Sequence, residues 1–190
     1  KVLDLGGGIG INYKNEKIIN FKTYAKIISN ISKSLSCKLV LEPGRILVAE
    51  SGILITKVLF IKRNKNKNFV IIDAGMNDLL RPALYDSYHK IKSIKKGVGK
   101  KEYYTIVGPI CETADTFAKK KLLNQLNIGE ILYFENVGAY GASMSSSYNS
   151  RPIIMEIIIY KNKFSVIRKE NTVINQISKE KIPSWVSKIK

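Results

Sequence analysis

The sequence has little cysteine, little arginine and no long apolar run. Its two cysteines, Cys37 and Cys111, lie in unrelated contexts with nothing to pair them, so a reduced, cytoplasmic protein is expected rather than a disulfide-rich one. The longest apolar run, 153–160, is interrupted by Glu156 and is far shorter than the roughly 20 residues of a membrane span. No signal peptide is present and the first residue is Lys1, so we expect the C-terminal part of a longer protein.

Acidic residues are also scarce, which leaves 32 lysines and arginines against 15 aspartates and glutamates and a formal charge of +17. The lysines are scattered through polar segments such as 62–68 and form no stripe, so we do not predict nucleic-acid binding. Three of the five arginines, Arg45, Arg81 and Arg151, lie beside proline or glycine. Arginine offers a rigid fork for a carboxylate or a phosphate, so these three are candidates for ligand binding.

Two short apolar strands, each followed by a polar turn, open the chain. Residues 1–5 lead into the glycine turn 6–10, and 38–41 lead into Glu42-Pro-Gly-Arg45, with a helix expected over 20–35 behind the cap Asn20. This order is typical of the last units of a β/α barrel, in which chemistry lies at the C-terminal strand ends. A dinucleotide-binding turn fits the glycine spacing poorly, and a purely structural tight turn remains an alternative.

Beyond Glu50 the pattern changes to short strands separated by glycine and proline turns. Strands are expected over 53–61, 69–73, 103–107, 131–136, 152–160 and 163–168, the last two as a hairpin. We therefore predict an α/β plus all-β chain with three parts: a barrel remnant over 1–50, an antiparallel, Greek-key-like β domain over 51–178, and a loosely ordered tail over 179–190.

The segment Gly108–Asp115 places a thiol beside a carboxylate. Gly108 and Pro109 end the preceding strand, because proline cannot donate to a sheet. Cys111 and Glu112 then stand together at a strand end, from which both could reach one cleft. The alternative is a structural cysteine beside a solvated glutamate. The single histidine, His89, is interpreted as a local hydrogen-bonding group.

Taken together, these turns resemble the diaminopimelate decarboxylases, which belong to the alanine-racemase-like, fold-type III group of pyridoxal-phosphate enzymes. The resemblance extends from Leu3 to about Ile177. The segments that carry it are Leu5–Gly10, Leu41–Arg45, Asp73–His89, Gly108–Glu112, Gly138–Tyr140 and Tyr148–Pro152. The long segment Asp73–His89 is the most specific, since ornithine and arginine decarboxylases usually differ there.

The resemblance implies pyridoxal 5'-phosphate as the cofactor and no metal. The cofactor-binding residues would be Gly6, Gly7, Gly8, Glu42, Pro43, Gly44, Arg45 and Tyr140. Most of them belong to the two N-terminal turns, which would surround the phosphate, because backbone N–H groups in such turns bind anions.

The resemblance also implies an amino-acid substrate and a homodimer. Substrate contacts would come from Arg45, Arg81, Tyr85, Glu112 and Tyr140. Cys111 would return a proton to the carbon that loses CO₂, which a thiol with a pKa near 8.5 can do at neutral pH. In this family the Cys-Glu pair reaches the partner subunit's cofactor, so the active sites would lie at the subunit interface.

Two features depart from the family pattern. Thr113-Ala114 stands where the family usually has Ser-Gly, and no lysine here lies in the motif of the Schiff-base lysine, which belongs to an early barrel strand. The 190 residues alone are therefore expected to be inactive. An ornithine- or arginine-type decarboxylase and a non-catalytic, dimerising module are the alternative interpretations.

Overall fold

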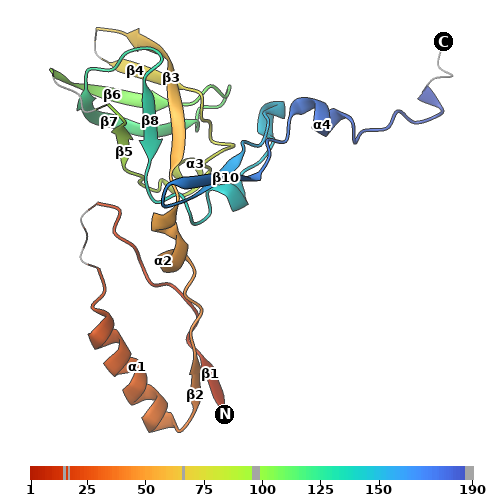
Figure 1. Ribbon diagram of the computed structural model, residues 1–190. Coiled ribbons are helices and arrows are strands. Elements are labelled where there is room, and N and C mark those ends of the chain that lie inside the picture. Colours follow the sequence, from red (N-terminus) through yellow and green to blue (C-terminus); the bar gives the residue numbers. More distant parts are fainter. Residues whose placement is uncertain (15, 17, 66, 96–98, 187–190) are drawn as a thin grey trace.

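The computed structural model describes residues 1–14, 16, 18–65, 67–95 and 99–186. Figure 1 shows a slender N-terminal unit, a sheet domain above it and a C-terminal arm that extends to one side. Part of the lysine-rich segment 62–68 (residue 66) and part of the predicted tail (187–190) lie outside the described residues.

The N-terminal unit consists of two parallel strands joined by a helix. Strand β1 (Val2–Asp4) pairs with β2 (Lys38–Val40), and α1 (Phe21–Leu35) connects them. The side chain of Asn20 accepts a hydrogen bond from the Thr23 N–H at 3.1 Å, which confirms the predicted helix cap. No residue of α1 is buried, and among the described residues before α2 only Ile11 is buried, in a small cluster with Ala49 and Ala139.

The sheet domain contains six strands in the order β5-β8-β3-β4-β6-β7 and is nearly closed. The strands are β3 (Leu54–Arg63), β4 (Asn68–Ile72), β5 (Ile91–Ser93), β6 (Lys101–Val107), β7 (Thr116–Asn124) and β8 (Ile131–Phe134). Side chains alternate between the two faces, as in any half-buried strand. Val70, Ile72, Ile106, Leu132 and Phe134 are fully buried and form the core.

The sheet is mixed, so the prediction of an antiparallel domain was wrong in one respect. Strands β4 and β6 pair in parallel, whereas the other four pairs are antiparallel. Parallel neighbours need a long crossover, and residues 73–100 provide it, including the short helix α3 (Arg81–Tyr85). Strand periodicity predicts an element but not its partner. Several elements were not predicted, among them α3, the three-residue strand β5 and the lysine-rich strand β7.

The two units meet at a junction of very small residues. Helix α2 (Arg45–Val48) continues into a 3₁₀ turn, Ala49–Ser51, in which Ala49 is completely buried. The Gly138 N–H donates to the Ala49 carbonyl oxygen at 3.0 Å, and a Cβ on Gly138 would collide with the carbonyl oxygen of Val48. Only glycine permits this approach, which fixes the loop 137–140 against the N-terminal unit.

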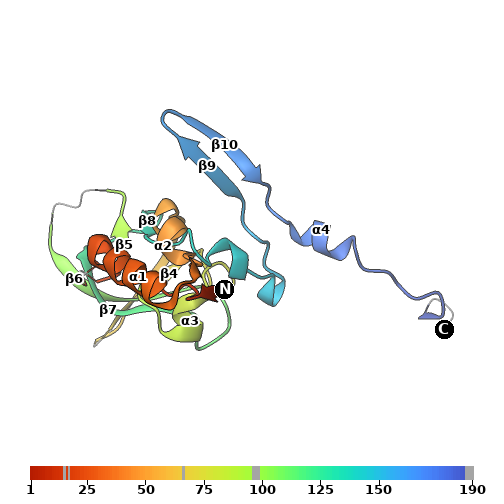
Figure 2. The ribbon, with the colours of Figure 1, turned by 90° about the horizontal axis from the view of Figure 1, so that it is seen from below.

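The C-terminal arm leaves the sheet domain after two 3₁₀ turns, Ala142–Met144 and Tyr148–Ser150. Its hairpin joins β9 (Glu156–Tyr160) to β10 (Lys163–Arg168), as predicted apart from residues 152–155, and α4 (Val173–Ile177) follows. Figure 2 shows the hairpin and α4 standing away from the rest of the chain. Within the described residues, no helix is long and apolar enough to cross a membrane.

Candidate functional site

The glycine turn and the Glu-Pro-Gly-Arg turn lie against each other. The Glu42 N–H donates to the Gly6 carbonyl oxygen at 2.8 Å, and a Cβ on Gly7 would collide with the Glu42 carbonyl oxygen. Gly6 and Gly8 have φ angles of +66° and +87°, which favour glycine. The backbone N–H groups of Gly7, Gly8 and Gly44 donate to no residue in the described part of the chain. These turns therefore fit the phosphate of the implied cofactor, because such donors can bind an anion.

Arg45 begins α2 immediately after this turn. Its guanidinium lies 6.0 Å from the ring centre of Tyr13, a cation–π distance. Tyr13 follows the glycine turn, and its loop is fixed because the side-chain amide of Asn136 donates to the Asn12 carbonyl oxygen at 3.1 Å. Tyr13 was not predicted as a site residue. Its place just after a ligand-binding turn is the signal in the sequence that could have identified it.

Arg81 lies between two tyrosine rings at the start of α3. Its guanidinium is 5.5 Å from the ring centre of Tyr85 and 5.0 Å from that of Tyr140. Tyr140 adopts a φ of +67°, which is rare for a bulky residue and costs free energy. Such strain is concentrated at functional sites. We refer to Tyr13, Arg45, Arg81, Tyr85 and Tyr140 as the arginine–tyrosine cluster.

His89 lies at the end of the α3 segment and is buried. Its Nδ1 is 3.0 Å from the Glu135 carbonyl oxygen, and its ring packs edge-to-face on Tyr13 with 5.6 Å between ring centres. Burial lowers the pKa of His89, and the positive charge of Arg81 lowers it further. The prediction that His89 is a hydrogen-bonding group agrees with this contact, but its partner is 46 residues away rather than local, and its position beside Tyr13 was not foreseen.

Cys111 and Glu112 lie on a separate loop, 108–115, which we call the cysteine loop. Asp115 fixes its base: one carboxylate oxygen accepts from the Ile110 N–H and the other from the Met76 N–H, both at 2.7 Å. Burial raises the pKa of Asp115 in spite of these bonds. At the tip, Cys111 and Glu112 are exposed, and the Tyr148 hydroxyl donates to Glu112 at 3.4 Å. The alternative of a buried structural cysteine was therefore wrong.

The third motif arginine, Arg151, has a structural position. Its guanidinium donates to Asn77 Oδ1 at 3.0 Å and to the Asp73 carbonyl oxygen at 2.6 Å, and it lies 3.9 Å from the buried carboxylate of Asp78. Burial raises the pKa of Asp78. Arg151 thus holds the turn after β4, the same turn to which Asp115 binds through Met76.

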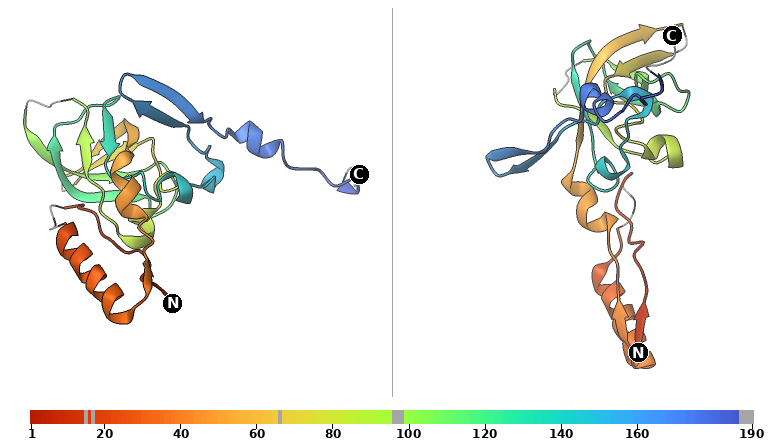
Figure 3. Two further views of the ribbon diagram at one scale, coloured as in Figure 1. Left: turned by 60° about the horizontal axis from the view of Figure 1, so that its bottom comes forward. Right: turned by 90° about the vertical axis from the view of Figure 1, so that its right-hand side faces the viewer.

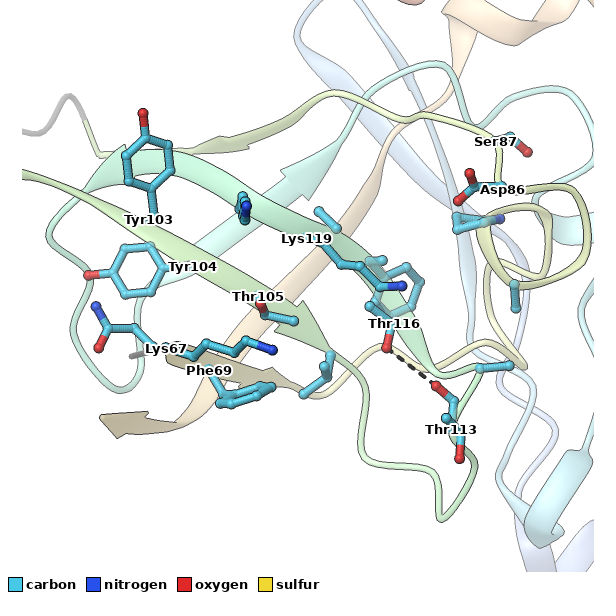
Figure 4. Close-up of a pocket in the computed structure, with 18 residues that line it drawn as sticks. Lys67, Phe69, Asp86, Ser87, Tyr103, Tyr104, Thr105, Thr113, Thr116 and Lys119 are labelled. Carbon is cyan, nitrogen blue, oxygen red and sulfur yellow. Dashed lines mark hydrogen bonds between the residues drawn. The ribbon is translucent and has the colours of Figure 1, made fainter. Parts of the chain in front are cut away.

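A cavity of about 830 Å³ lies beside β4, β6, β7 and α3 (Figure 4). Its lining includes Phe69, Thr105, Thr116, Lys119, Asp86 and Ser87. None of the residues predicted to bind cofactor or substrate lines this cavity, so we do not assign it to the site. One copy of the chain thus brings Arg45, Arg81, Tyr85 and Tyr140 into one region and holds Cys111 and Glu112 on a different loop.

Comparison with known proteins identifies the family of the chain. The chain is similar to a diaminopimelate decarboxylase of Zymomonas mobilis, 41% identical over 186 residues that make up 96% of this chain and 44% of that protein. A crystal structure of diaminopimelate decarboxylase from Helicobacter pylori complexed with L-lysine matches with a TM-score of 0.87 and 46% identity, over 94% of this chain and 44% of that one.

A lysine/ornithine decarboxylase from Vibrio vulnificus complexed with cadaverine is less similar. Its TM-score is 0.69 and its identity 25%, over 78% of this chain and 40% of that one. The chain thus spans less than half the length of the relatives it matches.

A family model described as "Pyridoxal-dependent decarboxylase, C-terminal sheet domain" matches residues 10–138, which is more than half of the chain. This range covers the sheet domain, the arginine–tyrosine cluster except Tyr140 at its edge, and the cysteine loop. The chain therefore belongs to the pyridoxal-dependent decarboxylase family and contains its C-terminal sheet domain.

Proposed function

We propose that the longer protein to which these residues belong decarboxylates meso-2,6-diaminopimelate, releasing L-lysine and CO₂ as the last step of lysine biosynthesis. The observation that carries the proposal is a set of arginine–tyrosine contacts, Arg45 with Tyr13 and Arg81 with Tyr85 and Tyr140. They occur in a chain whose glycine turns leave backbone N–H groups without a partner among the described residues. The relatives named above supply the substrate class, since the diaminopimelate decarboxylases are much more similar to this chain than the lysine/ornithine decarboxylase.

The two N-terminal turns would hold the cofactor. Gly6, Gly7 and Gly8 with Glu42, Pro43, Gly44 and Arg45 would bind the phosphate, and Tyr140 would contact the cofactor from the opposite loop. When bound, pyridoxal phosphate supplies the electron sink for the electron pair that CO₂ leaves behind. The free N–H groups of Gly7 and Gly8 support this assignment.

The arginine–tyrosine cluster would hold the amino-acid end that does not react. Arg45 and Arg81 would bind its carboxylate, with Tyr85 and Tyr140 limiting the positions that the Arg81 guanidinium can adopt. This fixes the orientation of the bond that breaks, and orientation of that kind lowers the barrier to reaction.

The cysteine loop would act on a second copy of the chain. The exposed Sγ of Cys111 would donate its proton to the carbon that has lost CO₂, and Glu112 would bind the distal ammonium group. Because the fixed base of this loop supports an exposed tip, the pair is built to reach a neighbouring molecule. We therefore propose a homodimer with shared active sites, in a reducing, cytoplasmic compartment that keeps the thiol free.

The test is CO₂ release by the full-length protein, with and without pyridoxal phosphate, from four substrates: meso-diaminopimelate, ornithine, arginine and lysine. We expect cofactor-dependent release from meso-diaminopimelate with a higher kcat/KM than from the other three. Preferred turnover of ornithine or arginine would contradict the substrate assignment. A cofactor-loaded protein that decarboxylates none of them would contradict the catalytic role.

A further inference from the structure

The buried histidine has one fixed nitrogen and one free nitrogen. Only 3% of the His89 surface is exposed, and its Nδ1 lies 3.0 Å from the Glu135 carbonyl oxygen. A carbonyl oxygen can only accept, so Nδ1 carries the hydrogen and donates it. In the neutral ring Nε2 is then an acceptor, and Nε2 has no hydrogen-bond partner within the described residues. A histidine that served the core alone would be expected to satisfy both nitrogens.

One side of this ring supports Arg45. Tyr13 packs edge-to-face on His89 at an interplanar angle of 77°, and the same ring lies 6.0 Å from the Arg45 guanidinium. The loop that bears Tyr13 is fixed by the hydrogen bond between Asn12 and Asn136. Tyr13 therefore couples the position of the His89 ring to that of the Arg45 guanidinium. A change at His89 is therefore transmitted to Arg45 through one aromatic ring.

The charge of Arg81 also acts on this ring. The two residues belong to one segment of the chain, and they are close enough for the charge of Arg81 to disfavour protonation of the histidine. The Nε of Arg81 is buried and, like the histidine Nε2, has no hydrogen-bond partner among the described residues. Glu135, whose carbonyl oxygen lies next to the histidine Nδ1, has its side-chain carboxylate paired with Lys92.

We propose that His89 is a positioning residue that sets the spacing between Arg45 and Arg81, and thereby the affinity of the site for the carboxylate of an amino-acid substrate. A neutral ring suits this place because a positive charge on it would repel the guanidinium of Arg81. The inference rests on the proposed function, since it assigns a role within the same site. It adds a residue that touches neither the turns nor the cysteine loop.

The experiment compares three variants of the full-length, cofactor-loaded protein. His89→Ala removes both the tether to Glu135 and the packing on Tyr13. His89→Asn keeps a neutral N–H donor near the position of Nδ1. Tyr88→Phe is the matched control, because Tyr88 is the adjacent half-buried ring but contacts Lys14 and Lys121 rather than the arginines. Each variant is measured for kcat and KM with meso-diaminopimelate and for the Kd of L-lysine by calorimetry.

For His89→Ala we expect KM and Kd to rise about tenfold, the size of one weakened charge-assisted hydrogen bond, with kcat within about twofold of wild type. His89→Asn should recover most of the affinity, and Tyr88→Phe should match wild type. A purely structural role would lower kcat through loss of folded enzyme and leave KM unchanged, which would overturn the inference, as would an unchanged KM and kcat.

The wild-type measurement separates the two proposals. If the wild-type protein decarboxylates meso-diaminopimelate and His89→Ala binds it normally, only the role of His89 is contradicted. If the wild-type protein neither turns over meso-diaminopimelate nor binds L-lysine, the proposed function is contradicted and the role of His89 with it.

Discussion

The arginine–tyrosine cluster and the cysteine loop are built in opposite ways. The cluster draws its members from four separate segments of one chain: Arg45 contacts Tyr13, and Arg81 contacts Tyr85 and Tyr140. The cysteine loop has its buried contacts at the base, through Asp115, and its chemistry at an exposed tip. Under the proposed function, one copy of the chain would form one wall of the binding site, and its cysteine loop would supply the proton donor to the site of a second copy.

The largest expected effect comes from the tip of the cysteine loop. Replacing Cys111 by alanine in the full-length protein should lower kcat about 1,000-fold, because a positioned general acid is lost. The apparent unfolding temperature should not change, since the side chain is exposed. Cys37→Ala is the matched control, as Cys37 lies far away between α1 and β2. Unchanged turnover by Cys111→Ala would refute the proton-donor role.

A substitution at the base of the cysteine loop should lower the free energy of unfolding. Asp115→Ala leaves the N–H groups of Ile110 and Met76 without their acceptor. Because burying the carboxylate itself is costly, as its raised pKa indicates, we expect a net loss of about 2 kcal/mol. Denaturant unfolding of the full-length protein measures this loss. Glu112→Ala, on the same loop but exposed, should leave the stability unchanged; equal losses in both variants would show that the base and the tip do not differ.

A substitution in the arginine–tyrosine cluster should weaken substrate binding. Arg81→Lys keeps the charge but removes the planar fork that Tyr85 and Tyr140 enclose, so KM for meso-diaminopimelate should rise about tenfold or more. Arg63→Lys is the control, since Arg63 is a half-exposed strand residue 3.8 Å from Glu102. A KM for Arg81→Lys that equals that of the control would remove Arg81 from the site.

The smallest expected effect is on the pH dependence of stability. The pKa of His89 is lowered in the folded state, so the folded protein binds fewer protons than the unfolded chain near the ordinary histidine pKa of about 6.5. The contribution of His89 to the free energy of unfolding should therefore be fully present above pH 7 and decrease as the pH falls through that region. The carboxyl groups of Asp78 and Asp115 have raised pKa values and act in the opposite direction, so wild type is compared with His89→Gln. Identical slopes in the two proteins would contradict the neutral, buried state of the ring.

The sequence was sufficient for most local elements, and it singled out segments whose roles in binding and catalysis stay predictions. Asn20 marked the helix start because its cap is a local hydrogen bond, and Arg45, Arg81 and Tyr140 stood out because arginine and aromatic residues were placed beside glycine and proline. Which strands pair with each other was not predictable, because the parallel pairing of β4 with β6 depends on the crossover between them. Tyr13 and His89 were missed for the same reason, since their roles depend on neighbours distant in the sequence, Arg45 and Glu135.

The N-terminal unit also shows that a local element is predictable whereas its packing is not. Its helix was predicted correctly, yet none of its residues is buried and the apolar side chains of Phe21 and Ile27 are half exposed. The views in Figure 3 show α1 set apart from the sheet domain, to which the unit is joined through α2. The two turns predicted to bind the cofactor are nevertheless fixed to each other through Gly6, Gly7 and Glu42.

Complementation between two inactive variants tests the division of the site most directly. Full-length Cys111→Ala and Arg81→Ala proteins are each purified, then mixed under conditions in which subunits exchange. Our account predicts recovery of about a quarter of the wild-type CO₂ release, because half of the randomly formed dimers are hybrids with one intact site of two. Mixed proteins that stay as inactive as the separate variants, although hybrids are shown to form, would contradict the claim that each site combines the cluster of one chain with the cysteine loop of another.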